Sequence, residues 1–136
     1  MRLKSTFINE RNTDLFKAFR HIVATCEINS QKEAIQKAIN TPSLRFWVTP
    51  ECATKAINRI RKGDDLAEMK PHRREMFFEI FHRYTIAKEK KEYRGKSVSY
   101  ICSFLVEEPA PSFYLTASTA IKLYEAYQRE KLCPTK

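Results

Sequence analysis

The segment Thr41–Thr49 reads TPSLRFWVT, and the segment Glu108–Thr116 reads EPAPSFYLT. Both run in the same order: proline, two variable residues, a polar residue, phenylalanine, a second aromatic residue, an aliphatic residue and threonine. Pro42 and Pro109 are 67 positions apart, as are Thr49 and Thr116. We call these two segments the aromatic boxes. A segment that recurs in this way indicates an internal repeat.

The match extends beyond the aromatic boxes. Upstream, the apolar residues of 35–39 align with those of 102–106 at the same spacing. Downstream, the aligned residues are Ala53, Ala56, Ile57 and Ile60 in the first copy and Ala120, Leu123, Tyr124 and Tyr127 in the second. Further upstream the spacing falls to 62, because Phe16 aligns with Phe78, and a charged insert at 88–96 absorbs the difference. We predict two tandem copies, residues 1–66 and 67–136, packed against each other as one compact body.

Each copy is predicted to fold as helix, helix, short extended segment, helix. In the first copy, apolar spacing predicts a helix over 14–26. Ser30 and Glu33 form a capping box for a helix over 31–40. Thr49 caps a helix over 50–62 that has proline at its first position and stops at Gly63.

The second copy repeats this plan. The predicted helices cover 73–88, 98–106 and 117–131, and Ser97 and Thr116 are the caps of the last two. The extended segments 46–48 and 113–115 either pair as short strands about a pseudo-twofold axis or serve only as core anchors. The predicted fold class is all-α, that is, mainly α with two short extended segments.

Composition limits the class of protein. With 136 residues, 43% hydrophobic and 30% charged, the chain suits one folded domain. Two glycines argue against a phosphate-binding loop or a dinucleotide-binding turn. No apolar stretch is long enough to span a membrane, and none follows the basic N-terminal residues as in a secretory signal. The cysteines show no CxxC pair, so we expect reduced thiols and a cytoplasmic location; they are Cys26, Cys52, Cys102 and Cys133.

The net charge of +9 is unevenly distributed along the sequence. Residues 1–63 carry 12 basic and 5 acidic side chains, whereas residues 64–136 carry 13 and 11. Such an excess in one half favours a localised anionic partner. A solvated basic surface without a partner remains the alternative.

The helix 50–62 concentrates this charge on one face. Its apolar residues form a buried stripe, and Lys55, Asn58, Arg59 and Lys62 lie on the opposite side. Lysine and the helix N-terminus suit phosphate, and asparagine and arginine can bind base edges. Arg45, Arg73 and Arg74 would add contacts to the nucleic-acid backbone. The helix 117–131 provides a comparison, because its equivalent residues have a net charge of +1 instead of +3; they are Lys122, Glu125, Ala126 and Arg129.

Other sites are less well supported. Phe46 and Phe113 are expected in the core, while Trp47 and Tyr114 either join them or offer stacking surfaces for single-stranded bases. No histidine shares a metal-ligand spacing with a cysteine, and no catalytic constellation stands out. We therefore expect no enzymatic activity, no catalytic residues, no metal and no cofactor.

The pattern Pro-x-x-Arg-Phe-Trp-Val-Thr-x-x-x-Ala at 42–53 resembles small uncharacterised bacterial proteins of phage and conjugative-element origin. This resemblance implies a setting in a mobile element and carries no residue roles. The helices 31–40 and 50–62 are also loosely similar to a helix–turn–helix, although the segment between them is longer than that turn.

We therefore expect a non-enzymatic protein that binds nucleic acid, DNA in the first instance, through the basic face of the helix 50–62. RNA is not distinguished from DNA by the sequence. The alternative is a protein-interaction or assembly module of a mobile element, with an incidental basic surface and a protein partner or a homo-oligomer. No membrane association is expected.

Overall fold

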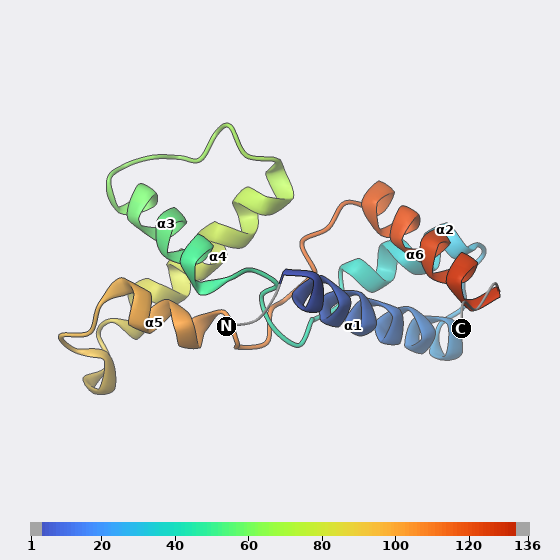
Figure 1. Cartoon of the computed structure of the whole chain (residues 1–136), viewed down its shortest axis with the longest axis horizontal. Helices are drawn as coiled ribbons and strands as arrows, with labels where there is room; N and C mark the ends of the chain where they lie inside the picture. The colour runs from blue at the N-terminus through green and yellow to red at the C-terminus, as the bar shows by residue number, and fades with distance from the viewer. Residues whose placement is uncertain (1–3, 133–136) are drawn as a thin grey trace. The chain divides into compact units, whose positions relative to one another are not determined.

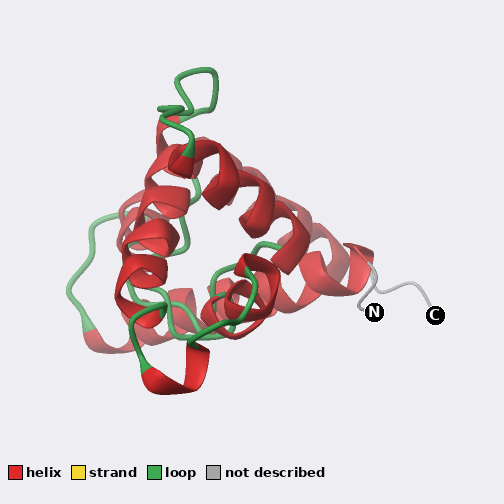
Figure 2. Ribbon diagram, turned by 90° about the vertical axis from the view of Figure 1, so that its left-hand side faces the viewer, coloured by secondary structure: helices red, strands yellow, loops and turns green. Residues whose placement is uncertain are grey.

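A computed structural model describes residues 4–132, with side-chain surroundings for residues 8–129. This part of the chain is helical and contains no strand, as the ribbon in Figure 2 shows. The α-helices are α1 (Lys4–Thr25), α2 (Gln31–Ile39), α3 (Pro50–Arg61), α4 (Pro71–Ala87), α5 (Val98–Leu105) and α6 (Ala117–Leu132), and a 3-10 turn, η1 (Lys91–Tyr93), precedes α5 (Figure 1). The expected all-α class is confirmed. No described helix has the length and apolar character needed to cross a membrane.

The predicted caps begin their helices. The hydroxyl oxygens of Ser30, Thr49 and Ser97 accept hydrogen bonds from backbone amides three residues on, each at 3.1 Å. Thr116 accepts from the amide of Thr119 at 3.2 Å. These bonds satisfy amides that a helix leaves unpaired at its first turn.

Two helices begin earlier than predicted. The structure starts α1 at Lys4, whereas the apolar spacing placed its start at 14. Residues 4–13 contain neither proline nor glycine, so no residue of this segment interrupts the helix. α4 starts at Pro71 instead of 73, because proline is well accommodated in the first turn.

The segments 46–48 and 113–115 are not strands within the described chain. The amide of Phe46 donates to the carbonyl of Val106 at the end of α5, at 2.9 Å. The amide of Phe113 donates to the carbonyl of Ile39 at the end of α2, at 3.0 Å. Phe46 and Phe113 are 0% and 3% exposed, so both anchor a core as expected.

The helices form two compact units. The split unit comprises residues 1–43 and 111–136 and contains α1, α2 and α6. The central unit comprises residues 44–110 and contains α3, α4, η1 and α5.

This division differs from the predicted 1–66 and 67–136, because α3 groups with α4 and α5 while α6 groups with α1 and α2. The hydrogen bond from Phe46 to the end of α5 directs the chain into α3 within the central unit. The packing of the two parts as one body stays a prediction.

Each unit has its own core. In the split unit, α2 lies against both α1 and α6 and contributes Ala34, Ile35, Ala38 and Ile39. Rings of α1 and α6 also meet, since the centroids of Phe16 and Tyr127 are 4.3 Å apart and those of Phe19 and Tyr124 are 4.6 Å apart. In the central unit the largest fully buried side chains are Phe46, Ile57, Leu66, Phe77, Ile80 and Ile101.

Candidate nucleic-acid interface

Helix α3 presents two faces, as its sequence predicts. Ala53, Ala56 and Ile57 are buried against the core of the central unit. Lys55 and Lys62 are exposed on the other side. Asn58 is half-buried and accepts a hydrogen bond from Arg61 at 3.5 Å. The two lysines of the predicted contact face are therefore open to a ligand.

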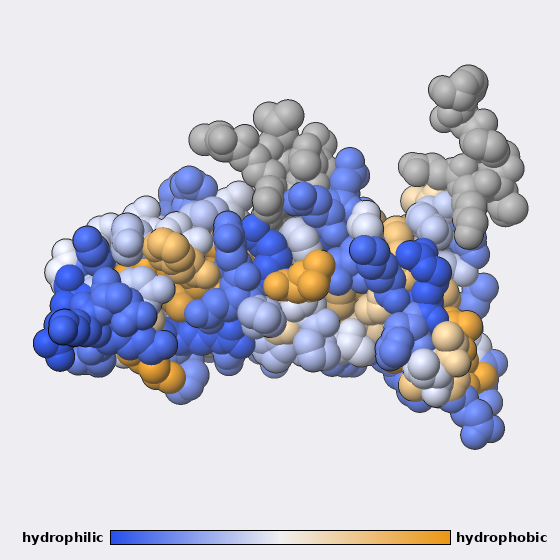
Figure 3. Space-filling view, turned by 90° about the horizontal axis from the view of Figure 1, so that it is seen from below, coloured by the Kyte–Doolittle hydropathy of each residue, from blue (hydrophilic) through white to orange (hydrophobic). Residues whose placement is uncertain are grey.

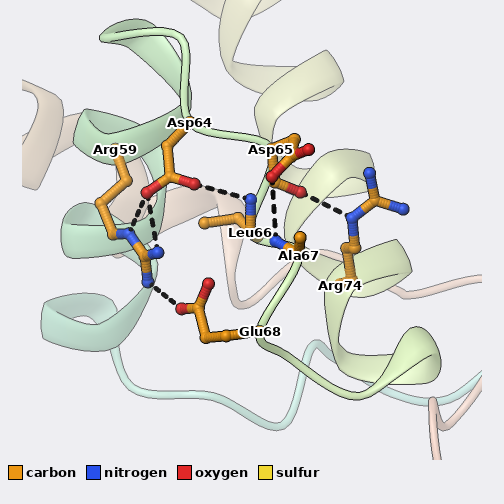
Figure 4. Close-up of polar contacts among 7 residues, drawn as sticks. All are labelled: Arg59, Asp64, Asp65, Leu66, Ala67, Glu68 and Arg74. Carbon is orange, nitrogen blue, oxygen red and sulfur yellow. Dashed lines mark hydrogen bonds and ion pairs between the residues drawn. The ribbon is translucent and has the colours of Figure 1, made fainter.

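Arg59 is engaged inside the unit, which corrects its expected role as a free contact. Its guanidinium lies 2.7 Å from Asp64 and 2.6 Å from Glu68, two carboxylates of the connector that follows α3 (Figure 4). Hydrogen bonds to Glu68 and Asp64 raise the pKa of Arg59 above its usual value. The pKa of Glu68 is lowered chiefly by its hydrogen bond with Arg59, and that of Asp64 chiefly by the amide of Leu66 and then by Arg59. An arginine held in this way offers little unpaired charge to a phosphate.

The connector 63–70 is itself held by these contacts. After α3, the amides of Gly63 and Asp64 donate to the carbonyls of Ile60 and Arg59, a Schellman arrangement in which Gly63 takes a φ of 97°. Asp64 accepts from the amide of Leu66 at 2.8 Å, and Leu66 is fully buried with a φ of 56°.

Arg74 holds the connector from α4. Its Nε donates to the backbone carbonyl of Asp65 at 2.6 Å, and its guanidinium lies 5.3 Å from the ring centroid of Phe78. Figure 4 shows Arg59 and Arg74 reaching this connector from different helices. Arg74 therefore has a structural contact that its sequence position did not indicate.

Arg45 is buried, and this also corrects the expected backbone contact. The residue is 9% exposed, and its guanidinium donates to the carbonyls of Phe46 and Val48 at 3.1 and 3.3 Å. It also lies 5.5 Å from the ring of Trp47. The sequence placed Arg45 before a buried phenylalanine, and the side chain folds back to satisfy the carbonyls of a segment without strand partners.

The remaining predicted residue, Arg73, is exposed at the start of α4, with its guanidinium 5.0 Å from the ring of Phe77. Arg61, which the sequence reasoning did not select, is also exposed, 5.9 Å from the ring of Tyr84. Trp47 and Tyr114 are half-buried. Stacking by either ring stays a prediction.

The uneven charge of the sequence does not separate the two compact units. The central unit carries 14 basic and 10 acidic side chains, a net of +4, and the split unit carries 11 and 6, a net of +5. The acidic connector after α3 and the carboxylates of 107–108 belong to the central unit and offset its lysines and arginines.

A second surface in the central unit was missed by the sequence reasoning. Tyr93, Tyr100 and Phe104 form a ring cluster on η1 and α5, beside the basic insert 88–96. The signal was present, because Tyr100 and Phe104 are four residues apart on one helix face while Ile101, Cys102 and Leu105 carry the buried stripe. In the sequence, the insert 88–96 stands out only because it absorbs the change of spacing within the second copy.

The thiols of Cys26, Cys52 and Cys102 are free, and Cys133 lies outside the described residues. Burial raises the pKa of the Cys102 thiol. Among the described residues no group of three His, Cys, Asp or Glu side chains could hold a metal ion.

Comparison of the chain with protein families, with curated proteins and with solved structures finds no match.

Proposed function

We propose that this protein binds duplex DNA through the outward face of α3, with Lys55 and Lys62 as the principal phosphate contacts. Asn58 and Arg61 lie on the same helix and are available to bind base edges or further phosphates. Arg73 adds an exposed cation at the start of α4. Arg45, Arg59 and Arg74 are left out of the contact set because they bind within the central unit.

The observation that carries the proposal is the exposure of Lys55 and Lys62. Neither lysine makes an ion pair within the part of the chain that the structure describes, and both lie on the side of α3 away from the buried Ala53, Ala56 and Ile57. Most of the affinity of proteins for DNA comes from such unpaired cations, because they displace counterions from the phosphates.

The test is a salt titration with labelled duplex DNA. Each phosphate contact contributes about 0.9 to the slope of log affinity against log salt concentration, so two or three contacts predict a slope of about −2 to −3. Replacing Lys55 and Lys62 by alanine should reduce the slope by nearly two such steps, that is, by about 1.8. The matched control replaces Lys122 and Arg129 on α6, which removes the same charge from the split unit.

An equal loss from both pairs of substitutions would mean attraction by net charge alone and would contradict the assignment to α3. The absence of measurable affinity at low salt would favour the protein-interaction module instead. The mobile-element setting implied by the resemblance at 42–53 stays a prediction.

We further propose that the chain arose by tandem duplication of a three-helix unit whose third helices then exchanged partners. The support is a pair of equivalent hydrogen bonds, from Phe46 to Val106 and from Phe113 to Ile39, whose phenylalanines and whose acceptors are each 67 positions apart. In each case the phenylalanine amide of one copy's aromatic box donates to a carbonyl at the end of the other copy's second helix. A variant shortened within 41–49, the segment that leads from α2 of the split unit to α3 of the central unit, tests whether the exchange can be reversed.

A further inference from the structure

The ring cluster of Tyr93, Tyr100 and Phe104 is unusual for its exposure. The ring centroids of Tyr100 and Phe104 are 5.2 Å apart, and Tyr93 lies 6.4 and 6.1 Å from them. Tyr100 is nevertheless 42% exposed and Phe104 47% exposed. The rings are held in place by one another, while part of their surface remains open to a ligand.

The core of the central unit does not need these outer rings. The inward side of α5 is already formed by Ile101, Cys102 and Leu105, which are 1%, 0% and 2% exposed. Exposed aromatic rings that contact one another, without a role in the core, are typical of a binding surface.

Basic side chains border the ring cluster. The insert 88–96 carries five basic residues and two acidic ones, and Lys96 lies 5.2 Å from the ring of Tyr100. All five basic side chains of the insert are exposed and make no ion pair within the described part of the chain; they are Lys88, Lys90, Lys91, Arg94 and Lys96. Figure 3 shows hydrophilic side chains crowded at its left-hand end, where the loop after α4 lies in Figure 1.

The nearby carboxylates are partly neutralised by other residues. Glu108 lies 3.2 Å from Arg83, and Glu107 lies 4.0 Å from Arg45. Glu89 and Glu92 remain in the insert, which keeps a net charge of +3. Burial, followed by the charges of Glu92 and Glu108, raises the pKa of Tyr93 further above its ordinary value of 10.0, so the phenol adds no negative charge to this surface near neutral pH.

We propose that this surface binds single-stranded nucleic acid, with Tyr100 and Phe104 stacking on bases and the lysines and arginine of 90–96 contacting the backbone. Stacking requires unpaired bases, whose faces a duplex conceals, and it tolerates any base sequence. The border of cations supplies the charge complementary to a phosphate chain. This surface goes beyond the proposed duplex contact, because it uses none of the α3 residues.

The experiment is fluorescence anisotropy of the full chain with a labelled thymidine oligonucleotide of about 15 nucleotides, long enough for one single-strand site. Replacing Tyr100 and Phe104 together by alanine should weaken binding of the single strand by about tenfold or more. The ring-preserving pair Tyr100→Phe and Phe104→Tyr should stay within about threefold of the wild type. Ile86→Ala is the matched control, because Ile86 is 53% exposed in the same unit but lies outside the ring cluster.

The duplex measurement separates this proposal from the previous one. Tyr100→Ala with Phe104→Ala should leave duplex affinity unchanged, whereas Lys55→Ala with Lys62→Ala should weaken the duplex and spare the single strand. Circular dichroism of each variant checks that the helices remain.

Three results would overturn the single-strand assignment. The first is no binding of the oligonucleotide by the wild type at low salt, even where duplex binding stands. The second is an equal loss in the ring-preserving variant. The third is competition by poly-glutamate as effective as that by unlabelled oligonucleotide, which would mean that charge alone, and an acidic protein equally well, satisfies the surface.

Discussion

Each unit has aromatic residues in its core, but within the described chain only the central unit also places a pair of them, Tyr100 and Phe104, on the outer face of a helix. In the split unit, Phe16 and Phe19 of α1 pair with Tyr127 and Tyr124 of α6, so the rings join helices. In the central unit α3 packs with small and aliphatic residues, and Tyr100 and Phe104 lie on the outside of α5. Aromatic content alone would not distinguish these units. Their difference shows that the position of a ring relative to the buried stripe decides whether it stabilises a core or is free to bind.

The largest test of this comparison is to separate the units. Residues 44–110 are contiguous and contain a complete core, so this fragment should unfold cooperatively. Residues 1–66 should not, because they lack α6 and expose Phe16 and Phe19. Thermal unfolding followed by circular dichroism distinguishes them. A cooperative transition in 1–66 and 67–136, with none in 44–110, would show that the sequence repeats are the true folding units.

The second test removes one anchor from each unit. Phe46→Ala and Phe113→Ala should each lower the free energy of unfolding by about 3–5 kcal/mol, because both rings are buried. The single tryptophan, Trp47, belongs to the central unit, so its fluorescence is expected to follow the unfolding of that unit. Phe46→Ala should therefore shift the fluorescence transition, while Phe113→Ala shifts only the circular dichroism. Identical shifts with both probes would mean that the units unfold together.

The third test concerns the end of α3. Gly63→Ala should destabilise the central unit by about 1 kcal/mol, because a φ of 97° disfavours a residue with a Cβ atom, although no atom lies within 4 Å of it. Gly63→Asn should cost less, since asparagine tolerates this region better. Urea midpoints followed by Trp47 fluorescence measure both. Equal losses of stability in the two variants would argue that the positive φ of Gly63 is not the cause of the destabilisation.

The fourth test asks whether the ion pairs of Arg59 with Asp64 and Glu68 keep this arginine from binding phosphate. Asp64→Asn with Glu68→Gln should free Arg59 and steepen the salt slope of duplex binding by about 0.9, the contribution of one new contact. Asparagine can still accept from the amide of Leu66, so the connector is retained. The control is Glu27→Gln with Glu125→Gln, which makes the same change in net charge in the split unit. An equal gain from the control would exclude a specific role for Arg59.

The smallest expected effect is on the pH dependence of the free energy of unfolding. The pKa values of Asp64 and Glu68 lie below their ordinary values of 3.8 and 4.5, so the unfolded chain binds more protons in acid. The free energy of unfolding that these two carboxylates contribute is fully present at pH values above their ordinary pKa values. It is lost as the pH falls through their lower pKa values in the folded state. Urea midpoints of the wild type should decline more steeply below about pH 4.5 than those of Asp64→Asn with Glu68→Gln. Parallel curves would show that the exposed pair adds no stability.

Much of the fold was predictable because local signals decide it. The hydroxyl caps, the glycine after α3 and the two buried phenylalanines follow from short-range chemistry. The partner of the third helix in each copy was not predictable. Either helix pair offers a similar apolar surface, and a periodic pattern shows which face is buried but not against which copy.

The candidate site was predictable only in part. Lys55 and Lys62 are exposed as expected, but the charge of the helix 50–62 was counted without the carboxylates that follow it. Asp64 and Glu68 lie five and nine residues after Arg59, and the turn at Gly63 brings them back to it.

Arg45 was expected to contact the nucleic-acid backbone, but its guanidinium binds the carbonyls of Phe46 and Val48. These carbonyls need donors because the segment pairs with no strand.

The interrupted course of the split unit has a consequence for synthesis on the ribosome. Translation proceeds from the N-terminus, so α1 and α2 emerge first but lack the helix that covers them until residues 111–132 have been made. The middle of the chain can meanwhile complete its own fold, at about 5–20 residues per second of elongation. The core of the split unit is therefore completed after that of the central unit, and Phe16 and Phe19 lack the rings of α6 for several seconds.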